Sequence, residues 1–274
     1  MNKTILITGA SSGIGLATAK YFAASGWNVI ATMRTPDREK GLTDQDRILV
    51  TRLDVQDRES IAPAISAGIA RFGKIDALVN NAGFSLFGVF ESLPVEKIQE
   101  QFSVNIIGVM DVTRAILPHF RQNRGGVIIN VGSRAGLIGL PLISPYCATK
   151  HALEGFSESL AYELASQNIA VKIVEPSGGV TDTSFSERMS RERASEAGLA
   201  DYNTFVQRTG EVFAGLQASR KTTAEEVAKV IHDAATDGAN QLRYFVGEDT
   251  GDFIRSKREK SDQEHFDFMR SKFL

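Results

Sequence analysis

Residues 4–15 read TILITGASSGIG, a short apolar run followed at once by a loop that holds three glycines. The run predicts a buried strand, and the residues after the loop can form a helix. A strand, a glycine turn and a helix N-terminus make an anion site, because free backbone N–H groups and the positive helix end point at the ligand. The glycines also let a pyrophosphate approach the backbone. Their spacing differs from G-x-G-x-x-G, so the loop alone is equally compatible with a structural turn.

Short apolar runs alternate with helical stretches through the first 175 residues, which is typical of βαβ units around a parallel sheet. Most runs are apolar throughout, as expected for strands that helices cover on both faces. The predicted strands are residues 4–7, 29–31, 48–50, 77–79, 127–129 and 170–174, with a seventh candidate at 244–246. Helical spacing occupies residues 57–72, 94–121 and 145–167. The sequence predicts an α/β fold, a doubly wound and mostly seven-stranded parallel sheet (Rossmann fold), in one domain over residues 1–274.

Composition narrows the function classes. Hydrophobic residues make up 42% of the 274 residues and charged residues 23%, an ordinary balance for a folded protein. The net charge of −2 disfavours a nucleic-acid partner, which normally needs a strongly basic face. The single cysteine, Cys147, excludes an internal disulfide framework, and no apolar run reaches the ~20 residues of a membrane helix. We expect a cytoplasmic protein with a small-molecule substrate and no membrane partner. We also expect no metal site, and His119 and His151 lack a partner motif.

Residues 182–220 interrupt the alternation of strands and helices. A loop of this length inside a compact domain is usually functional or disordered, and this one carries many large apolar residues. They are Phe185, Met189, Leu199, Tyr202, Phe205, Val206 and Phe213. We interpret the segment as a mobile helical lid over a site, and a helical pair packed permanently on the core is the alternative. The apolar tail, residues 250–274, is expected on the substrate side or on a neighbouring subunit.

The end of the second strand bears on the choice of nucleotide. NAD-binding folds usually place an acid there to hold the ribose hydroxyls, whereas a basic residue accommodates the additional phosphate of NADP. Residues 29–34 read VIATMR, with Arg34 at the tip and no acid. The sequence therefore predicts a preference for NADP(H) and leaves NAD(H) open. The alternative is that Arg34 is a solvated loop cation.

Residues 144–152 read SPYCATKHA and place Tyr146 and Lys150 four apart. On a helix, side chains four apart lie on one face, so this pair can flank one ligand. Transfer of a hydride to a carbonyl leaves an oxygen that needs a proton, and a nearby cation lowers the pKa of a tyrosine that supplies it. Chance produces such pairs often, so the pair gains meaning only with the residues around it.

Together, these segments make the chain resemble the short-chain dehydrogenase/reductase family, in its single-domain branch, over nearly the whole length. Residues 8–15 fit the family's T-G-x-x-x-G-x-G loop, and residues 146–150 fit its Y-x-x-x-K pair. Ser133 stands thirteen residues before Tyr146, the family's usual spacing. The remaining matches are Asp54 in LDV, the N-N-A-G segment of residues 80–83, and Asn105 in SVNI.

The resemblance implies four catalytic residues. Tyr146 is expected to be the general acid or base, with Lys150 lowering its pKa and binding the nicotinamide ribose. Ser133 is expected to hydrogen-bond the substrate oxygen, and Asn105 to help hold a water in the proton relay. Three of these residues also have a structural alternative: Ser133 as a strand-end hydroxyl, Asn105 as a helix residue that caps a bulge, and Lys150 as a surface ammonium.

The resemblance also implies a dinucleotide site at the carboxyl ends of the strands. Cofactor contacts are expected from Gly9, Ser11, Ser12, Gly13, Ile14, Gly15, Arg34, Asp54, Val55, Asn81, Ala82, Gly83, Tyr146, Lys150, Pro176, Gly179, Val180 and Thr181. Two places depart from the family's wording. Gly132 stands where a hydroxyl residue usually precedes the catalytic serine. Residues 176–183 read PSGGVTDT, so an inserted residue would make Thr183 the phosphate contact in place of the preferred Thr181.

The leading hypothesis is an NADP(H)-dependent oxidoreductase that interconverts a secondary alcohol and a ketone or aldehyde. Apolar residues expected around the substrate, within 84–87, 139–143 and 182–215, favour a hydrophobic substrate of steroid-like or retinoid-like type. A catalytically silent nucleotide-binding redox sensor or scaffold protein is the alternative from another class. Epimerase or dehydratase chemistry normally needs a larger sugar-binding region than this chain offers. We also expect a homodimer or homotetramer.

Overall fold

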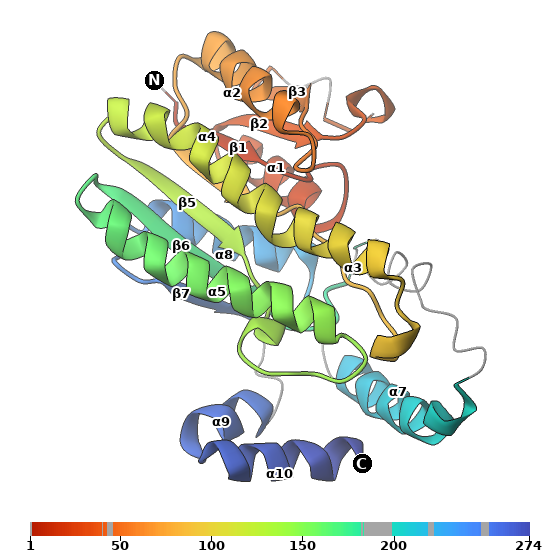
Figure 1. Ribbon diagram of the computed structural model, residues 1–274. Coiled ribbons are helices and arrows are strands. Elements are labelled where there is room, and N and C mark those ends of the chain that lie inside the picture. The colour runs from red at the N-terminus through yellow and green to blue at the C-terminus, as the bar shows by residue number, and fades with distance from the viewer. Residues whose placement is uncertain are drawn as a thin grey trace.

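The computed structural model describes residues 2–39, 41–42, 46–181, 183, 199–218, 222–247 and 252–274. Within them, seven strands form one parallel sheet in the order β3-β2-β1-β4-β5-β6-β7 (Figure 1). They are β1 (Thr4–Ile7), β2 (Asn28–Met33), β3 (Ile48–Arg52), β4 (Ala77–Asn80), β5 (Gly126–Val131), β6 (Ile169–Pro176) and β7 (Arg243–Val246). The predicted doubly wound, seven-stranded parallel sheet is confirmed.

β1 lies where the order of the strands reverses. Ile5 pairs with Val29 of β2 on one side and with Ala77 of β4 on the other. β2 leads outward to β3, whereas β4 leads through β5 and β6 to β7. In open parallel sheets, the loops that follow the strands on either side of such a reversal leave a crevice between them. The loops after Ile7 and Asn80 therefore meet at the carboxyl edge of the sheet.

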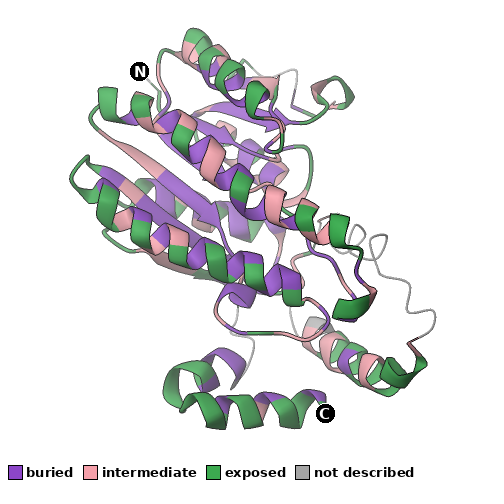
Figure 2. Cartoon of the chain, viewed as in Figure 1, coloured by how far each residue is buried: buried purple, intermediate pink, exposed green. Residues whose placement is uncertain are grey.

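Helices cover both faces of the sheet (Figures 1 and 2). α1 (Gly13–Ala24) and α8 (Ala224–Thr236) pack on one face, and α2 (Arg58–Phe72), α4 (Gly108–Gln122) and α5 (Ser144–Ala165) pack on the other. Within β1, Ile5 and Ile7 contact the first layer and Leu6 contacts the second, and all three are fully buried. This two-sided burial explains why the strands are apolar throughout.

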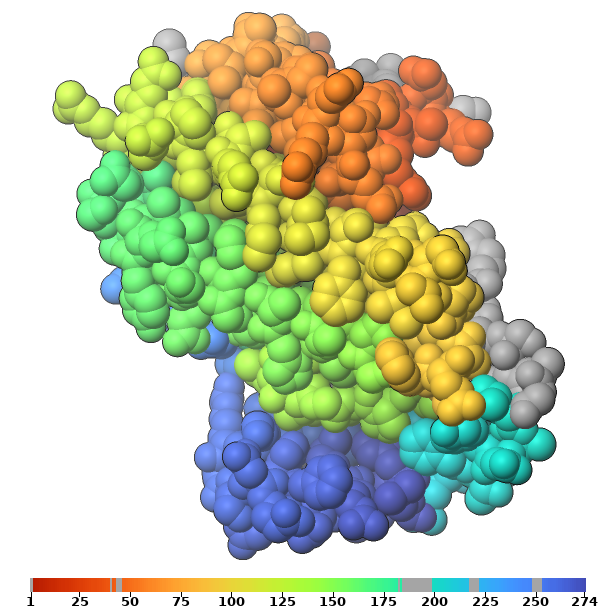
Figure 3. Space-filling view, viewed as in Figure 1, coloured from red at the N-terminus to blue at the C-terminus, as the bar shows by residue number. Residues whose placement is uncertain are grey.

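The tail forms a helical hairpin that packs against α7. α7 (Asn203–Ala218), α9 (Asp252–Glu259) and α10 (Asp262–Phe273) lie together beyond the carboxyl edge of the sheet (Figures 1 and 3). The ring centroids of Phe213 in α7 and Phe273 in α10 are 5.8 Å apart, and Phe253 of α9 belongs to the same apolar cluster. The tail thus contacts the described part of the predicted lid. Residues 184–198, which include Phe185 and Met189, lie outside the described residues.

None of the helices in the described ranges is both long and apolar enough to cross a membrane. The same ranges contain no group of three or more His, Cys, Asp or Glu side chains arranged to hold a metal ion.

Candidate active site

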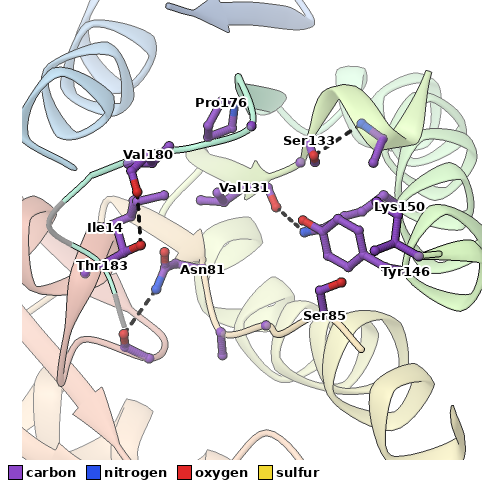
Figure 4. A pocket seen from close by; sticks show the side chains of 18 of the residues that line it. Ile14, Asn81, Ser85, Val131, Ser133, Tyr146, Lys150, Pro176, Val180 and Thr183 are labelled. Atoms are coloured by element: carbon purple, nitrogen blue, oxygen red, sulfur yellow. Dashed lines mark hydrogen bonds between the residues drawn. The ribbon is translucent and has the colours of Figure 1, made fainter. Parts of the chain in front are cut away.

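A cavity of about 790 Å³ runs along the carboxyl edge of the sheet (Figure 4). Its walls come from the loops after β1 to β6 and from α5, α7 and α9. Most of the predicted site residues line it together. They are Gly9, Ser11, Ser12, Gly13, Ile14, Arg34, Asp54, Val55, Asn81, Ala82, Gly83, Ser133, Tyr146, Lys150, Pro176, Gly179 and Val180. Gly15, Asn105 and Thr181 are the predicted residues that lie behind or beside this lining.

The loop after β1 turns in a way that requires glycine. Gly9 has a φ of 68°, in the left-handed region that disfavours other residues. Gly15, in the first turn of α1, lies so close to the loop that a Cβ atom there would be 2.3 Å from the Gly9 carbonyl oxygen. The backbone thus forms a concave cradle at the N-terminus of α1, which is a suitable shape and polarity for a pyrophosphate.

Hydrogen bonds fasten the glycine loop to the end of β4. The Thr8 hydroxyl oxygen accepts from the backbone N–H groups of Asn81 (3.0 Å) and Ala82 (3.1 Å). The Asn81 side-chain amide donates to the carbonyl oxygens of Thr8 (2.9 Å) and Gly9 (3.1 Å). The Asn81 side chain therefore holds the cradle in shape, a bracing role that the sequence did not reveal.

The end of the cavity beside β2 carries positive charge. Arg34 follows β2 and lines both the main cavity and an adjoining pocket of about 430 Å³. Arg38, in the short turn Pro36–Arg38, lines the same pocket, and sequence reasoning missed it. The Glu39 carboxylate, which also borders the pocket, accepts from the backbone N–H groups of Gly41 (2.7 Å) and Leu42 (2.8 Å). Two arginines therefore line this pocket, and the carboxylate of Glu39 beside them is already hydrogen-bonded to the backbone.

The catalytic candidates meet near the middle of the cavity, where β5 ends beside the start of α5 (Figure 4). The hydroxyls of Ser133 and Tyr146 share a hydrogen bond, and the Ser133 oxygen also accepts from the Ala135 N–H (3.2 Å). The Lys150 ammonium lies 5.7 Å from the centroid of the Tyr146 ring and donates to the Val131 carbonyl (2.7 Å). The predicted serine, tyrosine and lysine therefore form one cluster.

Burial dominates the proton affinities in this cluster. It raises the pKa of Tyr146 to about 12, although the hydrogen bond from Ser133 by itself lowers that pKa. Burial lowers the pKa of Lys150 to about 8, and the negative charge of Glu154 opposes that change. The pKa of Tyr146 therefore lies above its ordinary value instead of below it as expected, because burial disfavours the phenolate more than the Ser133 hydrogen bond favours it.

Asn105 links the cluster to the neighbouring loop rather than lining the cavity. It lies in a π-helical turn, Ser103–Ile107, between α3 (Val95–Phe102) and α4; such turns often mark functional sites. The Asn105 side chain accepts from the Phe84 N–H (3.0 Å) and donates to the Phe84 carbonyl (2.9 Å) and the Thr149 hydroxyl (3.1 Å). Thr149 in turn donates to the Tyr146 carbonyl, so Asn105 fixes the loop after β4 against the turn that carries Tyr146.

The two threonines after β6 occupy different places. The Thr181 N–H donates to the Thr222 carbonyl (2.9 Å), and its hydroxyl donates to the same oxygen (3.4 Å), outside the cavity lining. Thr183 lines the cavity and lies against the glycine loop, where a Cβ atom on Gly13 would be 3.2 Å from the Thr183 Cβ. Thr183, the alternative to the preferred Thr181, is therefore the threonine that lies against the glycine loop.

Apolar side chains surround the other end of the cavity. Phe87, Leu140 and Ile143 line it as predicted, whereas Phe84 is buried in the core. Other large apolar residues at this end are Ile138, Phe213, Leu216 and Phe253. Ile138 and Leu216 lie just outside the ranges predicted to contact the substrate, and Phe253 belongs to the tail, for which the substrate side was one of two predicted places.

Comparison with known proteins establishes the family. Residues 3–194 match the family model for short chain dehydrogenase. The chain therefore belongs to the short-chain dehydrogenase family and is an oxidoreductase of that family. It is 39% identical over 262 residues to the uncharacterized oxidoreductase YusZ of Bacillus subtilis, which covers 90% of each protein. It is 34% identical over 248 residues to retinol dehydrogenase 8 of Bos taurus, covering 85% of this chain and 78% of that protein.

Solved structures share the fold. A short-chain dehydrogenase from Streptomyces avermitilis superimposes with a TM-score of 0.81 at 31% identity, over 99% of this chain and 94% of that chain. ElxO with NADP bound superimposes with a TM-score of 0.72 at 28% identity, over 89% of this chain and 98% of that chain.

Proposed function

We propose that the protein is an NADP(H)-dependent oxidoreductase that interconverts an apolar secondary alcohol and the corresponding ketone or aldehyde. The observation that carries this proposal is the position of the hydrogen-bonded Ser133 and Tyr146 in the cavity. They lie between a glycine cradle at one end and an apolar chamber at the other. Hydride-transfer chemistry needs a nucleotide site, a substrate site and a proton donor at the boundary between them.

The residues of the cradle fit a dinucleotide. Gly9 and Gly15 leave the backbone open to a pyrophosphate, and Thr183 lies beside it. Arg34 and Arg38 would hold the additional phosphate of NADP, Asp54 and Val55 would contact the adenine, and Lys150 would bind the nicotinamide ribose. Gly179 and Val180 line the cavity and would contact the carboxamide of the nicotinamide. When bound, the nicotinamide supplies or accepts the hydride.

The protein's own residues manage the proton. Tyr146 keeps its proton at neutral pH, since burial raises its pKa to about 12, and it is therefore a general acid for reduction of a carbonyl. The Ser133 hydroxyl lies beside Tyr146 and would donate to the developing oxyanion of the substrate. The buried Lys150 ammonium would stabilise the phenolate that remains after Tyr146 gives up its proton.

The apolar chamber indicates the class of substrate. Phe87, Phe213, Leu216 and Phe253 come from three separate segments and present hydrocarbon to the cavity. Burial of such surface favours a ligand by ~25 cal/mol per Å² of apolar area, so a hydrophobic carbonyl compound would bind better than a sugar or a small acid. The similarity to retinol dehydrogenase 8 agrees with this class.

The test is a screen of ketones, aldehydes and alcohols with apolar groups of increasing size. The absorbance of NADPH reports turnover of each compound. We expect turnover with hydrophobic carbonyl compounds and tighter binding of NADPH than of NADH. Nucleotide binding without turnover of any member of the panel would instead support a nucleotide-binding sensor or scaffold.

A further inference from the structure

Two buried acids lie directly behind the Ser133 end of β5, and the chemistry proposed above does not use them. Glu154 is on α5, one turn after Lys150, and Glu175 is near the end of β6. The two residues are 6% and 0% exposed, respectively. Burying two carboxyl groups is costly unless they are paired or neutralised, so their placement calls for a specific arrangement.

Two glycines on either side of Ser133 make the room for these acids. A Cβ atom on Gly132 would lie 3.3 Å from the Glu175 Cγ and 3.4 Å from the Glu154 Oε1, and only 2.8 Å from a side-chain carbon of Ile173. A Cβ atom on Gly136 would lie 3.1 Å from the Glu154 Cγ. Gly132 stands where the family usually has a hydroxyl residue. The side chain missing at this position leaves space that the two acids occupy.

Charged groups from three elements face the pair in the described part of the chain. The Arg243 Nε of β7 donates to Glu154 (2.7 Å) and lies 3.8 Å from Glu175, while its Nη2 donates to the half-buried Glu158 (2.9 Å). Arg134, which follows Ser133, acts electrostatically on Glu175 and donates to the Gly247 carbonyl (2.8 Å). On α5 itself, Glu154 acts on the Lys150 ammonium.

A proton between the two acids accounts for their surroundings. Three of their oxygens, Glu154 Oε1 and both oxygens of Glu175, accept no hydrogen bond from any described group. Ionised carboxylates can only accept, so two of them in contact leave their oxygens unsatisfied. The carboxyl groups lie within hydrogen-bonding reach of each other, and burial together with Glu154 raises the pKa of Glu175 to about 8. A proton on Glu175 lets it donate to Glu154.

We propose that Glu154 is a positioning residue for Lys150, carrying the negative charge of the pair while Glu175 carries the proton. The negative charge, one helical turn from Lys150, opposes the burial that would otherwise remove the proton of the ammonium. The Arg243 guanidinium fixes the Glu154 carboxylate in this place. The inference rests on the proposed role of Lys150 beside Tyr146.

The test compares Glu154→Gln with two matched variants. Glu158→Gln removes the charge of another carboxylate that contacts Arg243, but one nearer the surface. Glu175→Gln imitates the protonated form of that acid. In the pH profile of kcat/KM, we expect the basic limb of Glu154→Gln to move down by about one pH unit, a tenfold change in the proton affinity of Lys150. We expect the limb to stay in place in the other two variants. Glu154→Asp, which keeps the charge, should restore it.

A measurement of stability tests the shared proton without activity. The raised pKa of Glu175 means that the folded protein holds its proton more tightly than the unfolded chain. Its contribution to stability is therefore full below about pH 4.5 and is lost as the pH rises to about 8. The unfolding free energy of the wild type should fall over this range relative to that of Glu175→Gln.

The outcomes separate this inference from the proposed function. If Glu154→Gln leaves the basic limb in place, or Glu158→Gln moves it equally, Glu154 has no special role, whether or not Tyr146 is catalytic. A difference in unfolding free energy between wild type and Glu175→Gln that does not change with pH would overturn the shared proton. If a variant is too unstable for its pH profile to be measured, the unfolding free energies of the wild type and Glu175→Gln still decide whether the acids share a proton.

Discussion

The dinucleotide end and the substrate end of the cavity are built in different ways. At the dinucleotide end, Thr8 and Asn81 fasten a glycine loop to the neighbouring strand through four hydrogen bonds of 2.9–3.1 Å. At the substrate end, apolar side chains from α7 and the tail form the wall. Backbone sterics tolerate almost no substitution, whereas apolar walls accept changes that keep volume. We therefore expect the first end to tolerate fewer substitutions than the second.

The boundary between the two ends should be the most sensitive to substitution. Ser133→Ala removes the hydroxyl that lies beside Tyr146 and faces the cavity. We expect kcat/KM to fall by about 10²–10³-fold, the usual loss of one oxyanion donor, with the Kd for NADPH unchanged. Steady-state kinetics and fluorescence titration measure the two quantities. Equal losses in both would mean that the serine supports the fold rather than the reaction.

The glycine cradle should fail when it is filled. Gly15→Ala places a methyl group 2.3 Å from the Gly9 carbonyl and 2.5 Å from the Asn81 side chain, so the loop must shift. We expect the Kd for NADPH to rise by about 100-fold and the unfolding free energy to fall by about 1–3 kcal/mol. Gly155→Ala is the control, because nothing lies within 4 Å of a Cβ atom at that exposed helical position. It should stabilise the protein by about 0.5–1 kcal/mol and leave binding unchanged.

The positive pocket should distinguish the two nucleotides. Replacement of both Arg34 and Arg38 by alanine removes the guanidinium groups that line the pocket beside the cradle. We expect the Kd for NADPH to rise by about 10–100-fold and the Kd for NADH to change little, since only NADPH carries the additional phosphate. Parallel fluorescence titrations measure both constants. Equal weakening of the two nucleotides would assign the arginines to the loop structure instead.

The apolar wall should show the smallest effect, and only with large substrates. Phe213→Ala removes a ring that lines the cavity and packs against Phe273. We expect KM for a hydrophobic ketone to rise by about tenfold, while KM for a small ketone and the Kd for NADPH stay unchanged. Phe266→Ala is the control, because that ring on α10 is 56% exposed. A similar change in both variants would show a general effect on the tail.

The fold and the pairing of Tyr146 with Lys150 could be predicted because their signals are local, whereas Ser133 and Asn105 were predicted from the family resemblance. The apolar runs that predicted strands all fall on observed strands, and the spacing of Tyr146 and Lys150 directly implies one helical face. The glycine loop is equally local, since its conformation depends on residues that are adjacent in the chain.

Other features depend on contacts between distant segments, which spacing does not encode. Phe253 reaches the cavity only because α9 and α10 fold back onto α7. Arg38 lines the pocket beside Arg34 because a short turn follows Arg34, and Thr183 rather than Thr181 lies against the glycine loop. The raised pKa of Tyr146 was not predicted because burial, its largest cause, cannot be read from a motif.

The most direct test of the central claim is the Tyr146→Phe variant, studied with a hydrophobic ketone from the substrate screen. The substitution keeps the ring, which is 9% exposed as part of Tyr146, and removes only the hydroxyl group that carries the proton. If Tyr146 is the general acid, kcat/KM should fall by about 10²–10⁴-fold while the Kd for NADPH stays within a factor of about two. Undiminished oxidation of NADPH by the ketone in this variant would contradict the claim.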